Sequence, residues 1–367
     1  MALTLHGTVS DNTVALDRKT ATPLIINGDM AISQRGTSLS SQSSSTRLLD
    51  RFSNDIGGGG AITISQDTDT PNSTFLNSMK MVVATADSSI AAADAYRFTY
   101  TVEGKDIATV GLGNSDCQTM TLTFWVRSSV TGTYGIGFQN SAETENYVDE
   151  YAISSANTWE KKVINIPVRT SGTWLTTNGV GLGIRWDLGS GTNYNGTADT
   201  WQTTSGKVYR TSSCVNWIAT ASATFYVTGV QLEVGTFDAN SIPPFQHESF
   251  GDSLIRCQRY CQVFAGGAAS DVFATGQAYG TTNWLCCLHL HTQMRTQPSV
   301  AFAGSASDYS VFSAAAGNVT TTSVSATNLT PDAVNLIGTT SSGLSAGNAT
   351  MLRALNATAS VTVTSEL

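Results

Sequence analysis

The chain has 367 residues, which is enough for two hydrophobic cores, and its 19 Lys and Arg against 27 Asp and Glu give a formal net charge of −8. No stretch concentrates basic residues and no apolar run reaches the roughly 18 residues of a membrane span, so we expect neither nucleic-acid binding nor membrane insertion. Charged residues make up only 13% of the chain. Ser, Thr, Gly and Asn take their place, which favours sheets over long helices and predicts an all-β protein.

Residues 1–23 are predicted to form an N-terminal arm that ends at Pro23. The first residues lack the basic leader and apolar centre of a secretory signal, so we expect synthesis in a cytoplasm. The six cysteines have no disulfide-rich spacing. We therefore expect them to be free thiols, most of them buried.

Residues 24–246 are predicted to form the first β domain, a β-sandwich. Strand-like segments begin with LIIN and ISQRG, continue after a Ser-rich loop with LLDRFSND, and resume after the glycines at 57–60. Nine further segments, from AITISQD to ATFYVTGVQLEVG, follow one another with turn residues between them. That spacing is typical of sandwiches.

Two strands in this domain have informative alternation. Leu122, Phe124 and Val126 share one face of residues 120–128, which predicts a core face, while Thr121, Thr123, Trp125 and Arg127 share the other. In residues 225–234 the apolar residues change face at Gly229, so we expect a β-bulge there. We also expect the segments around Ile25 and Leu232 to be neighbours in space, since a closed sandwich brings its terminal segments together.

Residues 236–249 contain two prolines and break the strand pattern, which predicts a domain boundary. Residues 247–264 have apolar residues at three- and four-residue spacing and are predicted to form a short linker helix. Strand patterns resume from residue 265 to residue 367 and predict a second, smaller β domain.

Three segments carry a resemblance to a known family: NGDMAISQRG at 27–36, DRF at 50–52, and the run from QLEVG to CQRY at 231–260. They resemble the opening, middle and closing motifs of a family of phage structural proteins, and the final TSEL is similar to a common terminus of that family. The matching region spans about residues 24–264. One departure is Asp252-Ser253-Leu254, where the family more often has Glu-Glu-Leu.

The resemblance implies a jelly-roll sandwich similar to carbohydrate-binding modules, carried on tail fibres, tailspikes or head fibres. It also implies a virion location, the trimeric assembly that is usual in such fibres, contacts with other virion proteins and contacts with host surface polysaccharide. We therefore expect a non-enzymatic virion structural protein, a homotrimeric fibre or spike. The alternatives are a capsid decoration protein that acts through protein contacts, and a polysaccharide depolymerase.

Aromatic residues supply the candidate glycan site. Sugars present apolar C–H faces together with hydroxyl groups, so a flat aromatic ring near polar side chains can stack and hydrogen-bond. Trp186, Tyr194 and Trp201 lie in one such stretch and are our candidates. The alternative is that these rings belong to the core or to a subunit contact.

Chemistry beyond binding has weaker signals. Asp29 and Glu233 could hold a structural calcium ion, as the resemblance implies, or could belong to ordinary turns. Glu143, Glu145, Asp149 and Glu150 could include a hydrolytic pair or form a solvated face. No nucleophile or phosphate-binding motif is present, so we expect no enzyme activity and no cofactor.

Cys287, His289 and His291 alternate along one predicted strand and so share a face. Such residues could converge on a transition metal at a threefold axis, as His-x-His motifs of some phage fibres do. The alternative, which we favour, is a wet or interface-facing strand without a metal.

Overall fold

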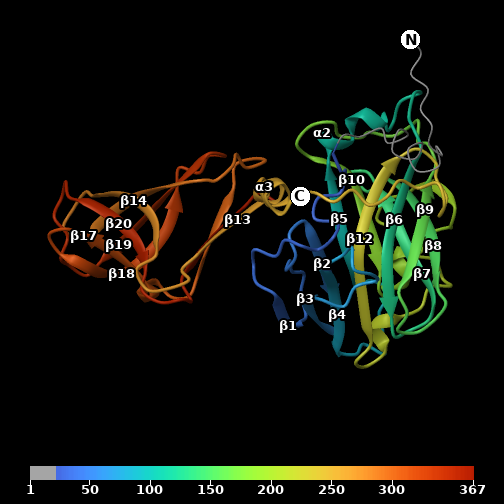
Figure 1. Cartoon of the computed structure of the whole chain (residues 1–367), viewed down its shortest axis with the longest axis horizontal. Coiled ribbons are helices and arrows are strands. Elements are labelled where there is room, and N and C mark those ends of the chain that lie inside the picture. Colours follow the sequence, from blue (N-terminus) through green and yellow to red (C-terminus); the bar gives the residue numbers. More distant parts are fainter. Residues whose placement is uncertain (1–21) are drawn as a thin grey trace, which may run out of the picture. The chain divides into compact units, whose positions relative to one another are not determined.

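A computed structural model describes residues 22–367, so nearly all of the expected N-terminal arm lies outside the described residues. The chain separates into two compact units, one ending at Phe250 and the other running from Gly251 to Leu367 (Figure 1). Both units consist mainly of antiparallel strands, which confirms the prediction of an all-β protein. Within residues 22–367, none of the helices has the length and apolar character needed to cross a membrane.

The first unit is a jelly-roll sandwich of two six-stranded sheets. The first sheet has the order β1-β3-β4-β12-β6-β9, and the second has the order β11-β8-β7-β10-β5-β2. Because the chain passes repeatedly from one sheet to the other, sequence neighbours such as β2 and β3 lie in different layers. The strands are β1 Ser38–Gln42, β2 Phe52–Gly57, β3 Ala61–Asp67, β4 Ser78–Thr85, β5 Ala95–Glu103, β6 Met120–Ser128, β7 Gly132–Gln139, β8 Glu145–Ile153, β9 Glu160–Ile166, β10 Val180–Asp187, β11 Thr200–Thr203 and β12 Thr224–Val234.

Short helical turns in this unit connect strands. They are α2 Gly104–Ile107, η1 Ala108–Val110, η2 Thr192–Tyr194 and η3 Trp217–Ala219. The core lies between the two sheets, and the predicted alternation of β6 is confirmed because Leu122, Phe124 and Val126 are all fully buried in it. Consequently, Trp125 lies on the outer face of the first sheet, where it is partly exposed.

The predicted bulge in β12 is confirmed. The register between β12 and β6 shifts between Thr228 and Gln231, and Gly229 has a φ of 62°. This left-handed conformation favours glycine. The bulge keeps Val227, Val230 and Leu232 in the core while it changes the direction of the strand.

The motif residues behind the family resemblance are structural. Asn27 donates from its amide nitrogen to the carbonyls of Ile32 and Asp50, both at 2.9 Å, and its amide oxygen accepts from the Ile32 backbone at 2.8 Å. The Asp50 carboxylate in turn pairs with Arg35 at 3.0 Å. These bonds join residues 27–36 to residues 50–52 in this chain.

The opening motif differs from the expectation in one respect. Residues 24–36 form turns instead of the two predicted strands, and the Ser-rich stretch contains strand β1. The predicted adjacency to β12 is nevertheless confirmed, because the Val230 backbone N–H donates to the Gly28 carbonyl at 2.9 Å. A Cβ on Gly28 would lie 2.1 Å from the Val230 carbonyl oxygen, so only glycine permits this approach.

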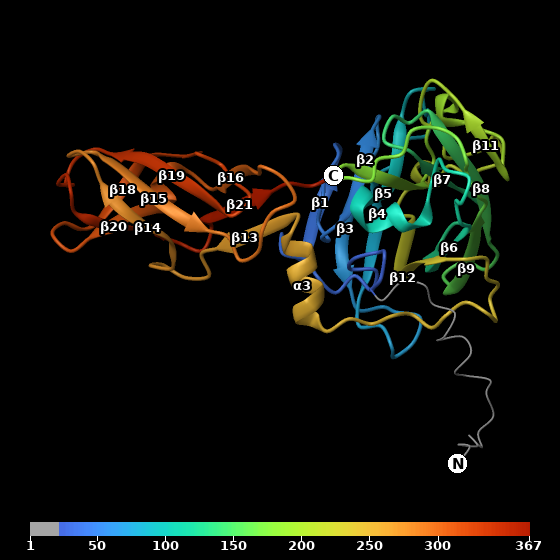
Figure 2. The ribbon, with the colours of Figure 1, turned by 90° about the horizontal axis from the view of Figure 1, so that it is seen from above.

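The second unit contains a closed six-stranded barrel, of order β14-β15-β19-β18-β17-β20, and a three-stranded sheet of order β13-β21-β16. Figure 2 shows these strands from a second direction, with α3 leading into β13. The elements are α3 Phe250–Gln258, β13 Cys261–Ala265, β14 Val272–Ala278, β15 Asn283–His289, β16 Ser299–Ala303, η4 Ala306–Asp308, β17 Tyr309–Ser313, β18 Gly317–Thr327, β19 Ala333–Thr340, β20 Ala349–Ala354 and β21 Ser360–Thr364.

The helix predicted at 247–264 is shorter than expected. It ends at Gln258, and β13 begins at Cys261 because residues 261–265 pair with Ser360–Thr364 of β21. Tertiary pairing thus overrides the local apolar spacing. In residues 22–367 the six cysteines form no disulfide with one another, and four of them are buried.

Candidate functional site

Trp186, the first of the three residues predicted to bind glycans, lies in the core. Its indole is 0% exposed and stacks on Phe98 with a centroid distance of 4.5 Å and an interplanar angle of 9°. Phe124 meets it edge-on at 5.8 Å. A sugar cannot reach this ring in the folded protein, so the prediction is wrong for Trp186, which is a packing residue.

Tyr194 lies at an open pocket of about 390 Å³. Its ring stacks on Tyr209 at 4.9 Å, and its hydroxyl donates to the Ala93 carbonyl at 3.1 Å. The pocket's two charged residues, Glu143 and Lys207, already pair with each other at 3.0 Å. Tyr194 therefore stays a candidate, but the charges beside it are already neutralised.

Trp201 lies on β11, at the edge of the second sheet. Its Nε1 donates to the Pro167 carbonyl at 3.0 Å, and its ring contacts Tyr147 and Trp174 at centroid distances of 5.5 and 5.7 Å. Tyr194 and Trp201 share no aromatic or hydrogen-bonding partner among these contacts. The three predicted residues therefore do not form one site, although binding at Tyr194 or Trp201 stays an untested prediction.

A different aromatic cluster lies on the outer face of the first sheet. Trp125 of β6 is the register partner of Lys161 on β9, so their side chains share this face. On the other side of Trp125, the bulge of β12 places Gly229 between two rings. A Cβ on Gly229 would lie 2.8 Å from Phe75 and 3.0 Å from Trp125, so the absence of a side chain opens the floor of a pocket.

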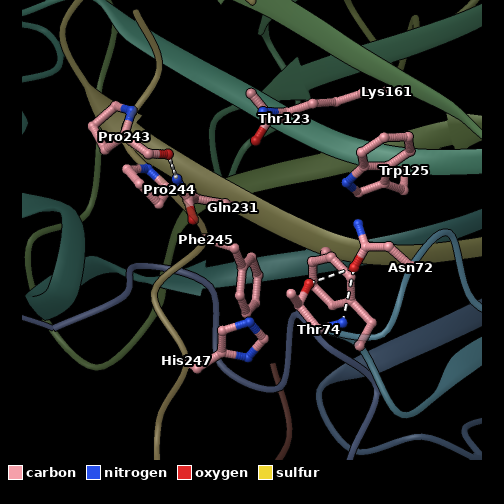
Figure 3. Close-up of a pocket in the computed structure, with 12 residues that line it drawn as sticks. Asn72, Thr74, Thr123, Trp125, Lys161, Gln231, Pro243, Pro244, Phe245 and His247 are labelled. Carbon is pink, nitrogen blue, oxygen red and sulfur yellow. Dashed lines mark hydrogen bonds between the residues drawn. The ribbon is translucent and has the colours of Figure 1, made fainter. Parts of the chain in front are cut away.

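The pocket beside Trp125 has a volume of about 300 Å³ (Figure 3). Phe75 comes from the loop between β3 and β4, whereas Phe245 and His247 come from the segment after β12. These three rings pack on one another at centroid distances of 4.7–5.4 Å. The lining residues are Asn72, Thr74, Phe75, Thr123, Trp125, Lys161, Gly229, Gln231, Pro243, Pro244, Phe245 and His247.

Hydrogen bonds hold two walls of the pocket in place. The Gln231 amide donates to the Pro243 carbonyl at 3.0 Å and accepts from the Gln246 backbone at 3.1 Å, which fixes the proline-containing wall. The Asn72 side-chain oxygen accepts from the Thr74 backbone at 2.9 Å. That bond leaves the Asn72 amide nitrogen directed into the pocket, on the side facing Trp125 (Figure 3).

Several polar groups of the lining have no protein partner. Within residues 22–367, Trp125 Nε1, the Asn72 amide nitrogen and the Thr123 hydroxyl make no hydrogen bond, and Lys161 makes no ion pair. Lys161 is exposed at the pocket, and partial desolvation of its ammonium group lowers its pKa below the ordinary value, with no carboxylate to oppose the shift. The pocket thus presents aromatic faces together with unengaged donors, which is the combination that a sugar ring requires.

The sequence prediction did not select Trp125, although the signal was present. Alternation in residues 120–128 places Trp125 on the face opposite the core. A tryptophan on the outer face of a strand, next to a bulge, is a stronger binding signal than one in a polar stretch. Phe75, Asn72 and Phe245 gave no such signal, because they lie far from Trp125 in the sequence.

The four acidic residues considered for hydrolysis do not lie in this pocket. Glu145 forms an ion pair with Arg169, Glu143 pairs with Lys207, and Glu150 accepts hydrogen bonds from Thr211 and Ser213. Asp149 lies beside Asp199, whose backbone N–H donates to the carbonyl of the residue before Asp149 at 2.8 Å. Burial and that neighbouring carboxylate raise the pKa of Asp149 to about 7.

Two groups of residues were considered as metal sites, Asp29 with Glu233 and Cys287 with His289 and His291. In the part of the chain that the structure describes, no group of three or more His, Cys, Asp or Glu lies close enough to hold a metal. Glu233 is buried at 3% exposure, whereas Asp29 is partly exposed. In β15, Cys287 and His289 lie on the outer face of the barrel, while His291 follows the strand and stacks on Phe264 at 4.9 Å.

Comparisons with known proteins found likeness at the level of the fold. No family model matches the chain, and no curated protein matches it. A putative sugar binding protein from Bacteroides thetaiotaomicron is 13% identical, with a TM-score of 0.32, over 58% of this chain and 100% of that one. A family 11 carbohydrate-binding module of Clostridium thermocellum is 11% identical, with a TM-score of 0.27, over 52% and 91%.

A third solved structure is the enzymatically active domain of tailspike protein 4 of bacteriophage CBA120. It is 14% identical to this chain, with a TM-score of 0.29, over 58% of this chain. The match covers only 21% of that chain. At such values the likeness concerns the architecture alone, and every statement about the pocket beside Trp125 comes from this chain's own geometry.

Proposed function

We propose that this chain is a non-enzymatic virion structural protein of a phage, a homotrimeric fibre or spike that binds host surface glycans at the pocket beside Trp125. The observation that carries the binding role is the partly exposed Trp125 ring, which lies among unengaged hydrogen-bond donors. The resemblance of residues 27–36, 50–52 and 231–260 to phage structural proteins supports the virion role.

The pocket suits weak and reversible binding. Its volume of about 300 Å³ gives room for a sugar ring to stack on Trp125 and to accept hydrogen bonds from Asn72 and Thr123. Single sites of this kind bind weakly. Several copies on one particle would raise the effective concentration and make attachment strong.

The test is retention of the purified full chain on immobilised host polysaccharide. Trp125→Ala should weaken binding by about 1–3 kcal/mol, the scale of a central aromatic contact. Tyr279→Ala is the matched control, because Tyr279 is an exposed aromatic, at 55%, in the second unit. Equal retention of Trp125→Ala and the wild type would contradict the proposed site.

The location of the protein distinguishes the proposal from its main rival. Electron microscopy of labelled particles should find the protein on a projecting fibre or spike. A position flat on the capsid lattice, together with no retention on any host polysaccharide, would instead support a decoration protein. Cleavage of the polysaccharide by the purified chain would support a depolymerase.

A further inference from the structure

The lysines and arginines on β4, β6 and β9 of the first sheet differ in whether they have an acidic partner. Lys80 pairs with Asp67 at 3.0 Å, and Arg127 pairs with Asp69. Lys162, the neighbour of Lys161 in sequence, pairs with Glu160. Lys161 itself has no carboxylate partner anywhere in residues 22–367.

Lys161 is also the cation that lines the pocket beside Trp125. It is the register partner of Trp125 across β6 and β9, and Figure 3 shows its side chain along the rim above the indole. Lys161 is exposed, so a ligand can reach its ammonium group, and partial desolvation lowers the pKa of that group while the protein supplies no counter-charge. A ligand that brings a negative charge would supply it.

The other residues that line the pocket also favour a negatively charged ligand. The chain has a formal net charge of −8, yet neither Asp nor Glu is among the residues that line the pocket. His247 adds a second basic side chain to the wall opposite Trp125. In a protein with an excess of acidic residues, this pocket is therefore a place where an anionic ligand meets no repelling carboxylate.

We propose, resting on the glycan-binding role argued above, that the pocket beside Trp125 selects a sugar that bears a carboxylate, as in an acidic polysaccharide. The apolar face of the sugar ring stacks on Trp125, its carboxylate accepts from the Lys161 ammonium group, and its hydroxyls bond to the Asn72 amide and the Thr123 hydroxyl. A carboxylate fits better than a phosphate group. A phosphate monoester carries a charge of about −1.5 to −2 at neutral pH, so the single charge of Lys161 would leave part of it uncompensated, whereas it matches the single charge of a carboxylate.

The experiment measures binding of the full-length chain to hexuronate oligosaccharides and to their carboxyl-reduced counterparts, which keep the same linkages but lack the charge. Calorimetry on the wild type should give about tenfold tighter binding to the hexuronates, and high ionic strength should remove most of that preference. Lys161→Gln should lose the preference and retain the weaker binding to the reduced sugars.

Lys162→Gln is the control. This substitution removes the same charge from the next residue in the sequence. Lys162 already pairs with Glu160 and faces the other side of β9, so the variant should keep the full preference. Circular dichroism melting of both variants verifies that they fold. Equal binding of charged and reduced sugars by the wild type would overturn the selectivity and leave the glycan-binding role intact. Binding of neither sugar would overturn both.

Discussion

Gly229→Ala tests whether the bulge of β12 shapes the pocket beside Trp125. The substitution places a methyl group 2.8 Å from Phe75 and 3.0 Å from Trp125, whereas carbon atoms in ordinary contact lie about 3.5 Å apart. At least one ring must therefore move. The φ of 62° adds the cost of a left-handed conformation. Left-handed strain of about 1–2 kcal/mol and overpacking of about 1–3 kcal/mol together predict a loss of roughly 2–5 kcal/mol in the free energy of unfolding.

Urea unfolding followed by tryptophan fluorescence measures this loss. Six of the seven tryptophans lie before residue 251, so the signal reports mainly on the first unit. Gly57→Ala is the matched control, because a Cβ at Gly57 meets no atom within 4 Å. It should change the free energy of unfolding by less than about 1 kcal/mol. If the two variants unfold at the same urea concentration, the described bulge geometry is wrong.

Three further outcomes follow from the structure. Trp186→Ala should cost about 3–5 kcal/mol of stability, because it removes a fully buried ring, and a variant with wild-type stability in urea unfolding would contradict the core assignment. Asp149 has a pKa raised from 3.8 to about 7, so its protonated form favours folding, and that stabilisation is lost as the pH rises between these values. Asp149→Asn, which cannot ionise, should therefore gain stability relative to the wild type across this range, and thermal melts with a constant difference would refute the shift. Elemental analysis of chelator-free protein should give less than about a tenth of an equivalent of zinc, iron or nickel per trimer, and stoichiometric metal lost in a His289→Ala variant would contradict this.

Local pattern predicted a large part of the fold. Alternation alone identified the core face of β6, and the change of face within residues 225–234 located the bulge at Gly229. The same rule also applies to β10, where Leu182, Ile184 and Trp186 alternate and are all fully buried. Alternation along β10 therefore predicts Trp186 as a core residue. The polar residues that follow it in the sequence favour a binding role, but the periodicity of the strand decides the position of its side chain.

The site itself was less predictable. Phe75 and Phe245 reach the pocket from loops that are 170 residues apart, and no short-range pattern brings such loops together. The sequence predicts a longer helix than the one at 250–258 because the apolar spacing continues past Gln258. Pairing of β13 with β21, at the far end of the chain, decides where that helix stops, and such long-range pairing is not visible in a local window.

The most direct test of glycan binding beside Trp125 follows the indole N–H signals of the tryptophans in an NMR spectrum of the full chain during titration with host surface polysaccharide. The Trp125 signal, assigned by its loss in Trp125→Phe, should shift, because Trp125 Nε1 is unengaged and lines the pocket. The Trp186 signal should not move, since this ring is 0% exposed. A titration that shifts the Trp201 signal and leaves Trp125 unchanged would contradict the proposed site and place glycan binding elsewhere on the first unit.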